Sequence, residues 1–334
     1  MLSILGLRPR SSAGVILCFH GVTTLAWPSY SDVHVPLAKF KSLIAAARGI
    51  GQLVPLRDLV QRNRAGRSTA GLVAITMDDA YASLLGEAAD FVRREAIPVT
   101  VFVVAGAAVS GASYWWDRID DVFPRVSTAR WRAFEDTAGL PAAYRSRELA
   151  HYGPLRPLRQ WVLAAHTGRW PSELDHLLRD LEHETGTCTQ QRSMTFEELD
   201  SFAALPSVDL AVHTVSHPVL PLLPDAELHR EITAGYDRVR ERYPNVVPIL
   251  AIPFGLFDRR TVHAAREAGM MASLTLAGTV LKQQRNEDDL PRFCMTRSDT
   301  ALKLRLRVVG VFERLRRWRE GTVRRYPALP SPTT

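Results

Sequence analysis

Short hydrophobic runs recur along the chain, and their pattern predicts the strands of a parallel sheet. Each run is five or six residues long, and most are rich in β-branched residues. Unbroken apolar runs are typical of strands that helices cover on both faces. The seven runs are Val15–Phe19, Leu72–Met77, Val99–Val104, Val208–Val212, Val247–Ile252, Met271–Leu276 and Leu290–Met295. They indicate an α/β fold, either an open doubly wound sheet or a barrel, and their number favours a barrel that is complete or nearly so.

Helical patterns with start and stop signals lie between most of these strands. Periodic apolar residues predict a helix over Tyr81–Ala96. Thr195, with Glu198 three residues later, has the sequence of a capping box at the start of another helix. Asp258 can cap a helix that stops at Gly269. Strands and helices therefore alternate, as a parallel sheet requires.

The alternation is interrupted from about residue 113 to residue 193, between the third and fourth strands. Helical patterns continue there at Trp131–Ala138, Pro154–His166 and Pro171–His183, without a convincing strand. A connection of this length predicts a helical insertion that forms a lid or a substrate-binding subdomain. We expect one barrel domain over residues 1–299 that carries this insertion, followed by a tail over residues 300–334.

Composition and charge narrow the class of protein. A chain of 334 residues that is 46% hydrophobic can fill a sizeable core. Its three cysteines, Cys18, Cys188 and Cys294, are odd in number and widely separated, so we expect reduced thiols instead of a disulfide framework. We see neither a secretory signal nor a transmembrane segment, which predicts a cytoplasmic protein or one peripheral to the inner membrane face.

The net charge of +7 comes from the tail. Residues 300–325 hold nine basic and two acidic residues, an excess that equals the net charge of the whole chain. Leu302–Trp318 reads as a basic amphipathic helix, with residues 302, 306, 309, 312, 315 and 318 on its apolar face. This helix could contact an anionic membrane surface, or it could pack on the barrel with a solvated basic face. No recognition motif accompanies the charge, so we expect no nucleic-acid partner.

Polar residues directly follow four of the predicted strands. Because all carboxyl ends of the strands in a parallel α/β fold open on one side, these residues should converge there. They are His20-Gly21, Asp78-Asp79, His213-Thr214-Val215-Ser216-His217 and Pro253-Phe254-Gly255.

This set of residue types is that of a catalytic metal site. One carboxylate and a histidine pair can supply three nitrogen and oxygen ligands and leave one position open. The second aspartate should face elsewhere, because neighbours on an extended segment alternate, and it could act as a base. Each piece alone has a plainer reading: Asp79 could cap the helix near Tyr81, the histidine pair could be coincidental, and His20 could belong to a turn.

Three segments resemble the motifs of the polysaccharide deacetylases, carbohydrate esterase family 4, which share a chitooligosaccharide-deacetylase homology domain. Thr76–Ala80 resembles the family's Thr-Phe-Asp-Asp-Gly motif, His213–His217 matches His-Ser/Thr-x-x-His in full, and Ala251–Gly255 resembles the third motif. The second motif is the most specific of the three. The resemblance covers about residues 14 to 297 apart from the insertion.

The resemblance implies a distorted (β/α)7 barrel, an activity and a role for each strand-end residue. Asp78 would be the general base, and the ligands of Zn²⁺ or a similar divalent ion would be Asp79, His213 and His217. The Pro253–Gly255 turn would direct a backbone N–H toward the developing oxyanion. The implied reaction removes N-acetyl groups from an amino-sugar-containing polysaccharide or glycoconjugate, with metal-bound water as the nucleophile.

The sequence departs from the family pattern at three places. Ala80 replaces the usual Gly, a mild change unless the position needs a positive φ. Ala251 stands where many members have an arginine that orients the base. The Met271–Leu276 segment lacks the histidine that many members use as general acid.

The exopolysaccharide-type subgroup offers a replacement for the missing acid. Its strand order is permuted, and an aromatic-histidine segment near its N-terminus takes the acid's place; Phe19–Val22 resembles that segment, so His20 is the candidate acid. Tyr114–Asp117 also resembles a feature of this subgroup, although its aromatic residues could simply pack under a lid. The expected partner is an N-acetylated glycan that is lipid-linked or nascent. Two alternatives stay open: an amidase or deformylase acting on another C–N bond, and a catalytically decayed glycan-binding protein.

Overall fold

A computed structural model describes residues 11–24, 31–145, 155–281 and 289–311, and every structural statement below refers to these residues. The main sheet runs in the order β10-β9-β8-β7-β6-β5-β1-β11, and all of its pairs are parallel. Its strands are β1 (Val15–Phe19), β5 (Leu72–Met77), β6 (Val99–Val103), β7 (Val208–Val212), β8 (Ile249–Ala251), β9 (Ala272–Thr275), β10 (Asp289–Pro291) and β11 (Phe293–Cys294). The short strands are β2 (Val22–Thr23), β3 (Val35–Pro36) and β4 (Gln52–Leu53).

The last predicted strand is split in two, and the split closes the sheet. β10 pairs with β9 at one end of the sheet, whereas β11 pairs with β1 at the other end. Arg292 lies between the two halves, and its backbone N–H donates to Thr275 O on β9. Residues 289–294 thus join both ends of the sheet. The sheet is nearly closed into a barrel with seven strand positions, which follow one another around the barrel in the order of the chain. The expected barrel is confirmed.

Strand residues alternate between a helix-facing layer and the barrel interior, as the two-residue period of a strand requires. Val15, Leu17 and Phe19 of β1 belong to the core beneath the surrounding helices. Ile16 of the same strand belongs to a second cluster, inside the barrel, together with Phe102 of β6. Continuous burial on both faces explains why the strands read as unbroken apolar runs.

Helices cover the outer face of the barrel. They are α1 (Leu37–Ile50), α2 (Leu56–Arg64), α3 (Glu87–Arg94), α4 (Ala107–Ser110), α9 (Phe196–Ala203), α10 (Asp225–Arg242), α11 (Arg259–Glu267) and α12 (Ala301–Val308). The capping boxes at Thr195 and Asp258 are present. The single helix expected over Tyr81–Ala96 is wrong, because the chain forms a 3-10 turn at Ala82–Leu84 and α3 begins only after Gly86, whose φ is +66°.

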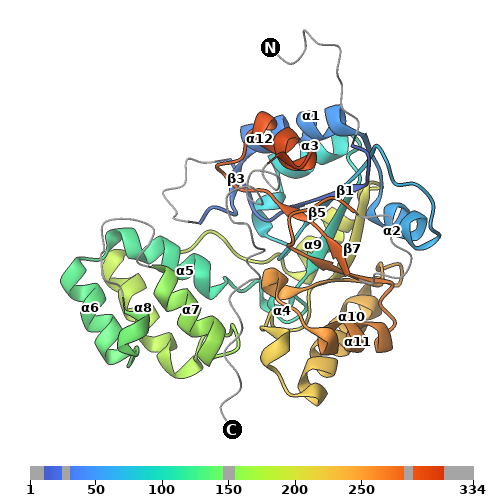
Figure 1. Cartoon of the computed structure of the whole chain (residues 1–334). Helices are drawn as coiled ribbons and strands as arrows, with labels where there is room; N and C mark the ends of the chain where they lie inside the picture. The colour runs from blue at the N-terminus through green and yellow to red at the C-terminus, as the bar shows by residue number, and fades with distance from the viewer. Residues whose placement is uncertain (1–10, 25–30, 146–154, 282–288, 312–334) are drawn as a thin grey trace.

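The region between β6 and β7 forms a helical lobe beside the barrel (Figure 1). It contains α5 (Trp115–Val122), α6 (Thr128–Thr137), α7 (Leu155–Ala165) and α8 (Asp175–Thr185). The lobe has a hydrophobic core of its own around Trp131 and Phe134. Arg118 on α5 ties it together by bonding Glu182 and Asp175 of α8. Its extent as a domain stays a prediction.

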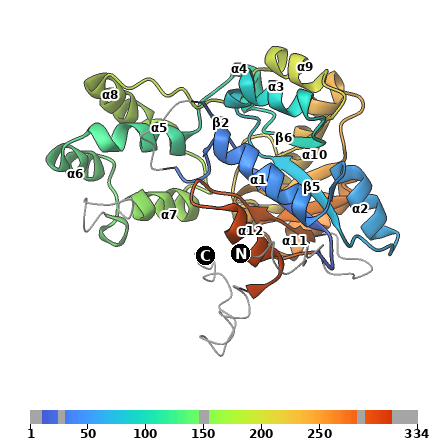
Figure 2. The same cartoon turned by 90° about the horizontal axis from the view of Figure 1, so that it is seen from above.

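The start of the basic tail packs on the barrel. α12 lies against α1, and its Leu304 and Val308 are buried in the helix-facing core (Figure 2). Leu302 and Val309, from the face expected to be apolar, are 53% and 36% exposed. The expected positions 312, 315 and 318 lie outside the described residues, so contact with a membrane stays a prediction. Among the described helices, none combines the length and apolar character that crossing a bilayer requires.

Candidate metal-dependent active site

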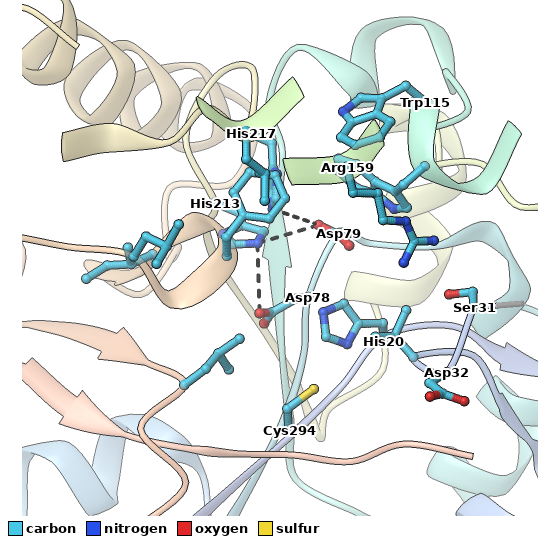
Figure 3. A pocket seen from close by; sticks show the side chains of 17 residues that line it. His20, Ser31, Asp32, Asp78, Asp79, Trp115, Arg159, His213, His217 and Cys294 are labelled. Carbon is cyan, nitrogen blue, oxygen red and sulfur yellow. Dashed lines mark ion pairs between the residues drawn. The ribbon is translucent and has the colours of Figure 1, made fainter. Parts of the chain in front are cut away.

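The polar residues expected at the strand ends lie together at the mouth of the barrel (Figure 3). Asp79, after β5, places its Oδ1 3.5 Å from His213 Nε2 and 3.6 Å from His217 Nε2. His213 directly follows β7. All three side chains are buried. The convergence inferred from strand polarity therefore holds for this group.

The three side chains fit a divalent metal ion. Metal bonds of about 2.1 Å in a tetrahedral site separate neighbouring ligand atoms by about 3.4 Å, close to the spacing found here. Asp79 Oδ1 is buried and has no hydrogen-bond partner among the described residues. Burial raises the pKa of Asp79 to about 7, and the positive charge of His20 offsets this only in part. A cation between these atoms would satisfy the oxygen and remove that cost.

The ring of His213 is oriented for metal binding. Its Nδ1 lies 2.8 Å from Ala251 O. Because a carbonyl oxygen can only accept, Nδ1 must carry the proton and donate it. Burial lowers the pKa of His213 to about 4, so the ring is neutral at neutral pH. Its Nε2 then presents a lone pair to Asp79, as a metal ligand requires.

Asp78 lies in a different environment from its neighbour. Arg292 donates from Nη1 to Asp78 Oδ1 at 2.7 Å and from Nη2 to Oδ2 at 2.8 Å, and both side chains are buried. Burial alone would raise the pKa of Asp78, but the charge of Arg292 and its hydrogen bonds to the carboxylate hold it well below its usual value. Asp78 is therefore ionised in the folded protein at neutral pH.

Arg292 corrects the expectation that Asp78 lacks an arginine. Ala251 stands at the usual arginine position, but the guanidinium arrives from the opposite side, between β10 and β11. It lies over the ring of Phe102, with 5.4 Å from Cζ to the ring centroid. Sequence reasoning missed it because the surrounding run was read only for its hydrophobicity. The available signal was the arginine itself, because a charged residue in a strand buried on both faces is rare unless it is paired.

Strained backbone surrounds the site. Within the described ranges, five of the seven non-glycine residues with positive φ lie at these strand ends: Asp79, Ala80, Thr214, His217 and Phe254. The turn at Asp79 explains how both aspartates reach the cavity, which simple alternation along a strand would not allow. Ala80 has a φ of +48°, so the replacement of Gly is not mild and costs on the order of 1 kcal/mol or more. Asp79 caps no helix, because neither the following 3-10 turn nor α3 has a side-chain cap.

His20 lies beside Asp78 and Cys294 on the cavity wall (Figure 3). Burial opposes its protonation, but Cys294 and the charges of Asp79 and Asp78 outweigh burial and raise the pKa of His20 to about 9. The ring is therefore protonated at neutral pH. A protonated imidazole at this place is able to donate a proton to a group held in the cavity.

The cavity above these residues has a volume of about 450 Å³ and a largely apolar wall. Trp115 and Trp116 from the helical lobe face Phe254 and Leu256 from the turn after β8. Phe254 packs edge-on against His217, with 4.5 Å between ring centroids. The N–H groups of Gly255 and Leu256 donate within this turn, to Ile252 O and Pro253 O.

Aromatic residues at the start of α5 fasten the lobe to the segment that carries Asp79. Tyr114 OH donates to Asp79 O at 2.8 Å. Asp117 accepts from Tyr81 OH at 2.6 Å and lies equally close to His34 Nε2. Trp116 stacks on Tyr114 and tilts over the ring of His217. The Tyr114–Asp117 run therefore both packs under the lobe and shapes the site.

The far end of the lobe also reaches the site. Gly168 has a φ of +80°, and a Cβ on it would lie 2.8 Å from the Phe254 ring. Arg169 donates to Glu231 of α10, whose other carboxylate oxygen accepts from the N–H groups of Val215 and Ser216. Sequence reasoning did not single out Arg169 or Glu231. Together they support the loop that carries the two histidines.

Comparison of the sequence with family models gives one match. Residues 161–273 match the model of the polysaccharide deacetylase family. The matched segment contains β7, the His213–His217 motif and the turn after β8, but not the two aspartates after β5. No curated protein sequence matches the chain.

Solved structures resemble the fold over most of the chain. The deacetylase PplD of Streptococcus pyogenes in complex with acetate has a TM-score of 0.58 and 12% identity, covering 89% of this chain and 99% of that one. IcaB from Ammonifex degensii gives 0.56 and 16%, covering 90% and 98%. A de-N-acetylase from Aggregatibacter actinomycetemcomitans gives 0.53 and 11%, covering 88% and 99%. At these identities the likeness is one of fold.

Proposed function

We propose that the chain, whose residues 161–273 match the polysaccharide deacetylase family, is a metal-dependent hydrolase of that family that removes N-acetyl groups from an amino sugar. The substrate is a polysaccharide or a glycoconjugate. The observation that carries the proposal is the contrast between two adjacent aspartates. Asp78 is ionised against Arg292. Asp79 Oδ1 has no hydrogen-bond partner among the described residues and lies beside two imidazoles whose pKa values burial lowers. Two carboxylates with opposed environments are suited to two different roles.

The divalent ion, for which zinc fits best, is held by Asp79, His213 and His217. When bound, it supplies Lewis-acid polarisation of the acetyl carbonyl and lowers the pKa of a nearby water. Asp78 accepts the proton of the attacking water, since it is ionised and directed into the cavity. The N–H of Phe254 donates to the oxygen on which negative charge develops. His20 donates a proton to the departing amine nitrogen, which is a poor leaving group until it is protonated.

The walls of the cavity suit a sugar ring. Trp115, Trp116 and Phe254 present flat apolar faces, while the polar groups gather at its base. Such a division, with a few convergent polar groups in an apolar pocket, fixes the orientation of a ligand. The acetyl group would enter toward Asp79, and the sugar would lie against the lobe. The position of His20 at the end of the first strand supports the exopolysaccharide-type subgroup.

Acetate release tests the proposal directly. The zinc-loaded protein should release acetate and leave a free amine when incubated with N-acetylated oligosaccharides. Dialysis against a chelator should abolish the release, and added zinc should restore it, because the carbonyl loses its polarising group. Formate release or the opening of a cyclic amide, without acetate, would favour the amidase alternative. If the protein bound the N-acetylated oligosaccharides but released acetate from none of them, a decayed site would be favoured and the proposal contradicted.

The role of His20 can be separated from simple damage to the site by the choice of leaving group. His20→Gln should slow hydrolysis of an N-acetyl amine by about 10²–10⁴-fold, the usual contribution of a general acid. The same variant should hydrolyse 4-nitrophenyl acetate at a rate close to that of the unmodified protein, because nitrophenolate departs without protonation. Steady-state rates on both substrates provide the measurement. Equal losses on both would show that His20 does not act as the acid.

A further inference from the structure

A second group of metal-binding side chains lies next to the first and has different chemistry. Cys18 of β1 is directly opposite Cys294 of β11 in the parallel register. His20 follows Cys18 by two residues, so it projects from the same side of the chain. One ligand atom from each of the three lies within 4.8 Å of the other two. The closure of the barrel therefore assembles a cluster of two thiols and an imidazole.

The cluster lies partly in the cavity wall and partly in the core. Cys18 is fully buried, whereas His20 and Cys294 line the cavity. Figure 3 places the Cys294 sulfur below His20, on the side of Asp78 away from Asp79. His20 Nδ1 is buried and has no hydrogen-bond partner in the described ranges. A buried nitrogen without a partner is costly unless a ligand satisfies it.

We propose that Cys18, His20 and Cys294 form a second metal site, which takes soft or borderline ions such as zinc and cadmium. Two thiolates and one imidazole are a known ligand set for tetrahedral zinc, and the fourth position would open into the cavity. Bonds of about 2.3 Å place two zinc-bound sulfurs about 3.8 Å apart. Because the ligand atoms lie within 4.8 Å of one another, the side chains need to close by at most about 1 Å. Each thiol releases its proton to solvent as its sulfur binds, and no redox change occurs.

The two sites differ in the ions that they should prefer. Asp79, His213 and His217 offer only oxygen and nitrogen, whereas the second cluster offers two sulfurs. Sulfur ligands select soft ions over hard ones. The consequence for activity rests on the proposed function: His20 cannot protonate a leaving amine while it is bound to a metal. Excess soft metal should therefore inhibit the enzyme.

Cadmium titration tests the site without reference to activity. The reduced, metal-free protein with Cys188→Ser, which removes the exposed third thiol, is titrated with Cd²⁺. We expect the ultraviolet charge-transfer absorption of cadmium-bound thiolates to appear with the intensity of two thiolates. Adding Asp79→Asn should leave it unchanged, since that variant alters only the first site. Absence of the absorption in the Cys188→Ser protein would overturn the proposal.

Ligand variants identify the sulfurs. Cys294→Ser and Cys18→Ala, each in the Cys188→Ser background, should lose the two-thiolate absorption, and His20→Gln should weaken cadmium binding at least about tenfold. Circular dichroism checks that each variant is folded; should Cys18→Ala fail this check, Cys294→Ser decides alone. Undiminished absorption in a folded Cys294→Ser protein would contradict the assignment.

Activity measurements separate this inference from the proposed function. For each protein, acetate release in excess Cd²⁺ is compared with the rate of the same protein at one equivalent of metal. Excess Cd²⁺ should inhibit the Cys188→Ser protein more strongly than its Cys294→Ser derivative. Charge-transfer absorption in a protein that releases no acetate would support the site and reject the proposed function. If the charge-transfer absorption appeared but acetate release kept its full rate in excess cadmium, the proposal that metal bound to His20 inhibits the enzyme would be rejected.

Discussion

Asp78→Asn should slow acetate release by about 10²–10⁴-fold or more, while the protein still binds one zinc ion at Asp79, His213 and His217. Asparagine keeps the shape of the side chain but cannot accept a proton from water. The ligand atoms of Asp79, His213 and His217 are unchanged by the substitution. Turnover rates and metal content by atomic absorption measure the two effects. Full activity in the variant would show that Asp78 is not the base.

A matched control separates lost chemistry from lost stability, because Asp78→Asn also leaves the buried Arg292 without a charged partner. Asp299 is equally buried and pairs with Lys303 and Arg307 of α12. Asp299→Asn should therefore lower the melting temperature as Asp78→Asn does, but it should leave acetate release near the unmodified rate. If both variants lost activity in proportion to stability, the special role of Asp78 would be contradicted.

Arg292→Met should lower the free energy of unfolding by about 3–5 kcal/mol at neutral pH, because a buried carboxylate is left without its partner. The pKa of Asp78, which Arg292 holds low, should rise. Stability from a carboxyl with a lowered pKa is present above its unfolded pKa and is lost as the pH falls through the folded value. The stability difference between the two proteins should therefore be largest near neutral pH and shrink below about pH 4. Denaturant unfolding at several pH values provides the measurement.

The same variant should change the pH dependence of turnover. A base must be deprotonated, so a higher pKa of Asp78 moves the acidic limb of kcat/KM to higher pH. Arg57→Met is the control, since Arg57 forms an exposed pair with Asp209 and should cost at most about 1 kcal/mol. The double variant Asp78→Asn with Arg292→Met should cost less than the sum of the single variants. An unshifted acidic limb would show that Arg292 does not control the ionisation of Asp78.

The strands were predictable from the sequence because burial on both faces leaves a simple pattern. The runs at Val15–Phe19 and Leu72–Met77 coincide with β1 and β5. The split of the last strand was not visible, since Leu290–Met295 is continuous in hydrophobicity apart from Arg292. Only the pairing of its two halves with different neighbours reveals the break. Hydrophobicity reports burial, but it does not report which strand is adjacent.

The candidate site was partly predictable for a related reason. Strand polarity alone brings Asp79, His213 and His217 to one end of the barrel. The position of Arg292 depends on how the sheet closes, which is a property of the whole chain. The contributions of Gly168 and Arg169 depend on the path of the helical lobe, for which the sequence offers no periodic signal. Their assignment needed three-dimensional contacts, and the chemical roles of the strand-end residues stay predictions.

The segment that closes the barrel also carries the partner of Asp78, and this links the timing of synthesis to the onset of activity. Residues 289–294 are the last strand segment in the described chain. A ribosome-bound chain that stops before Arg292 has an unclosed sheet and a buried carboxylate without its counterion. The proposed mechanism needs an ionised Asp78, and such a nascent chain lacks the group that keeps it ionised. It therefore predicts that a chain ending before Arg292 releases no acetate, and that activity begins only when the final strand joins the first.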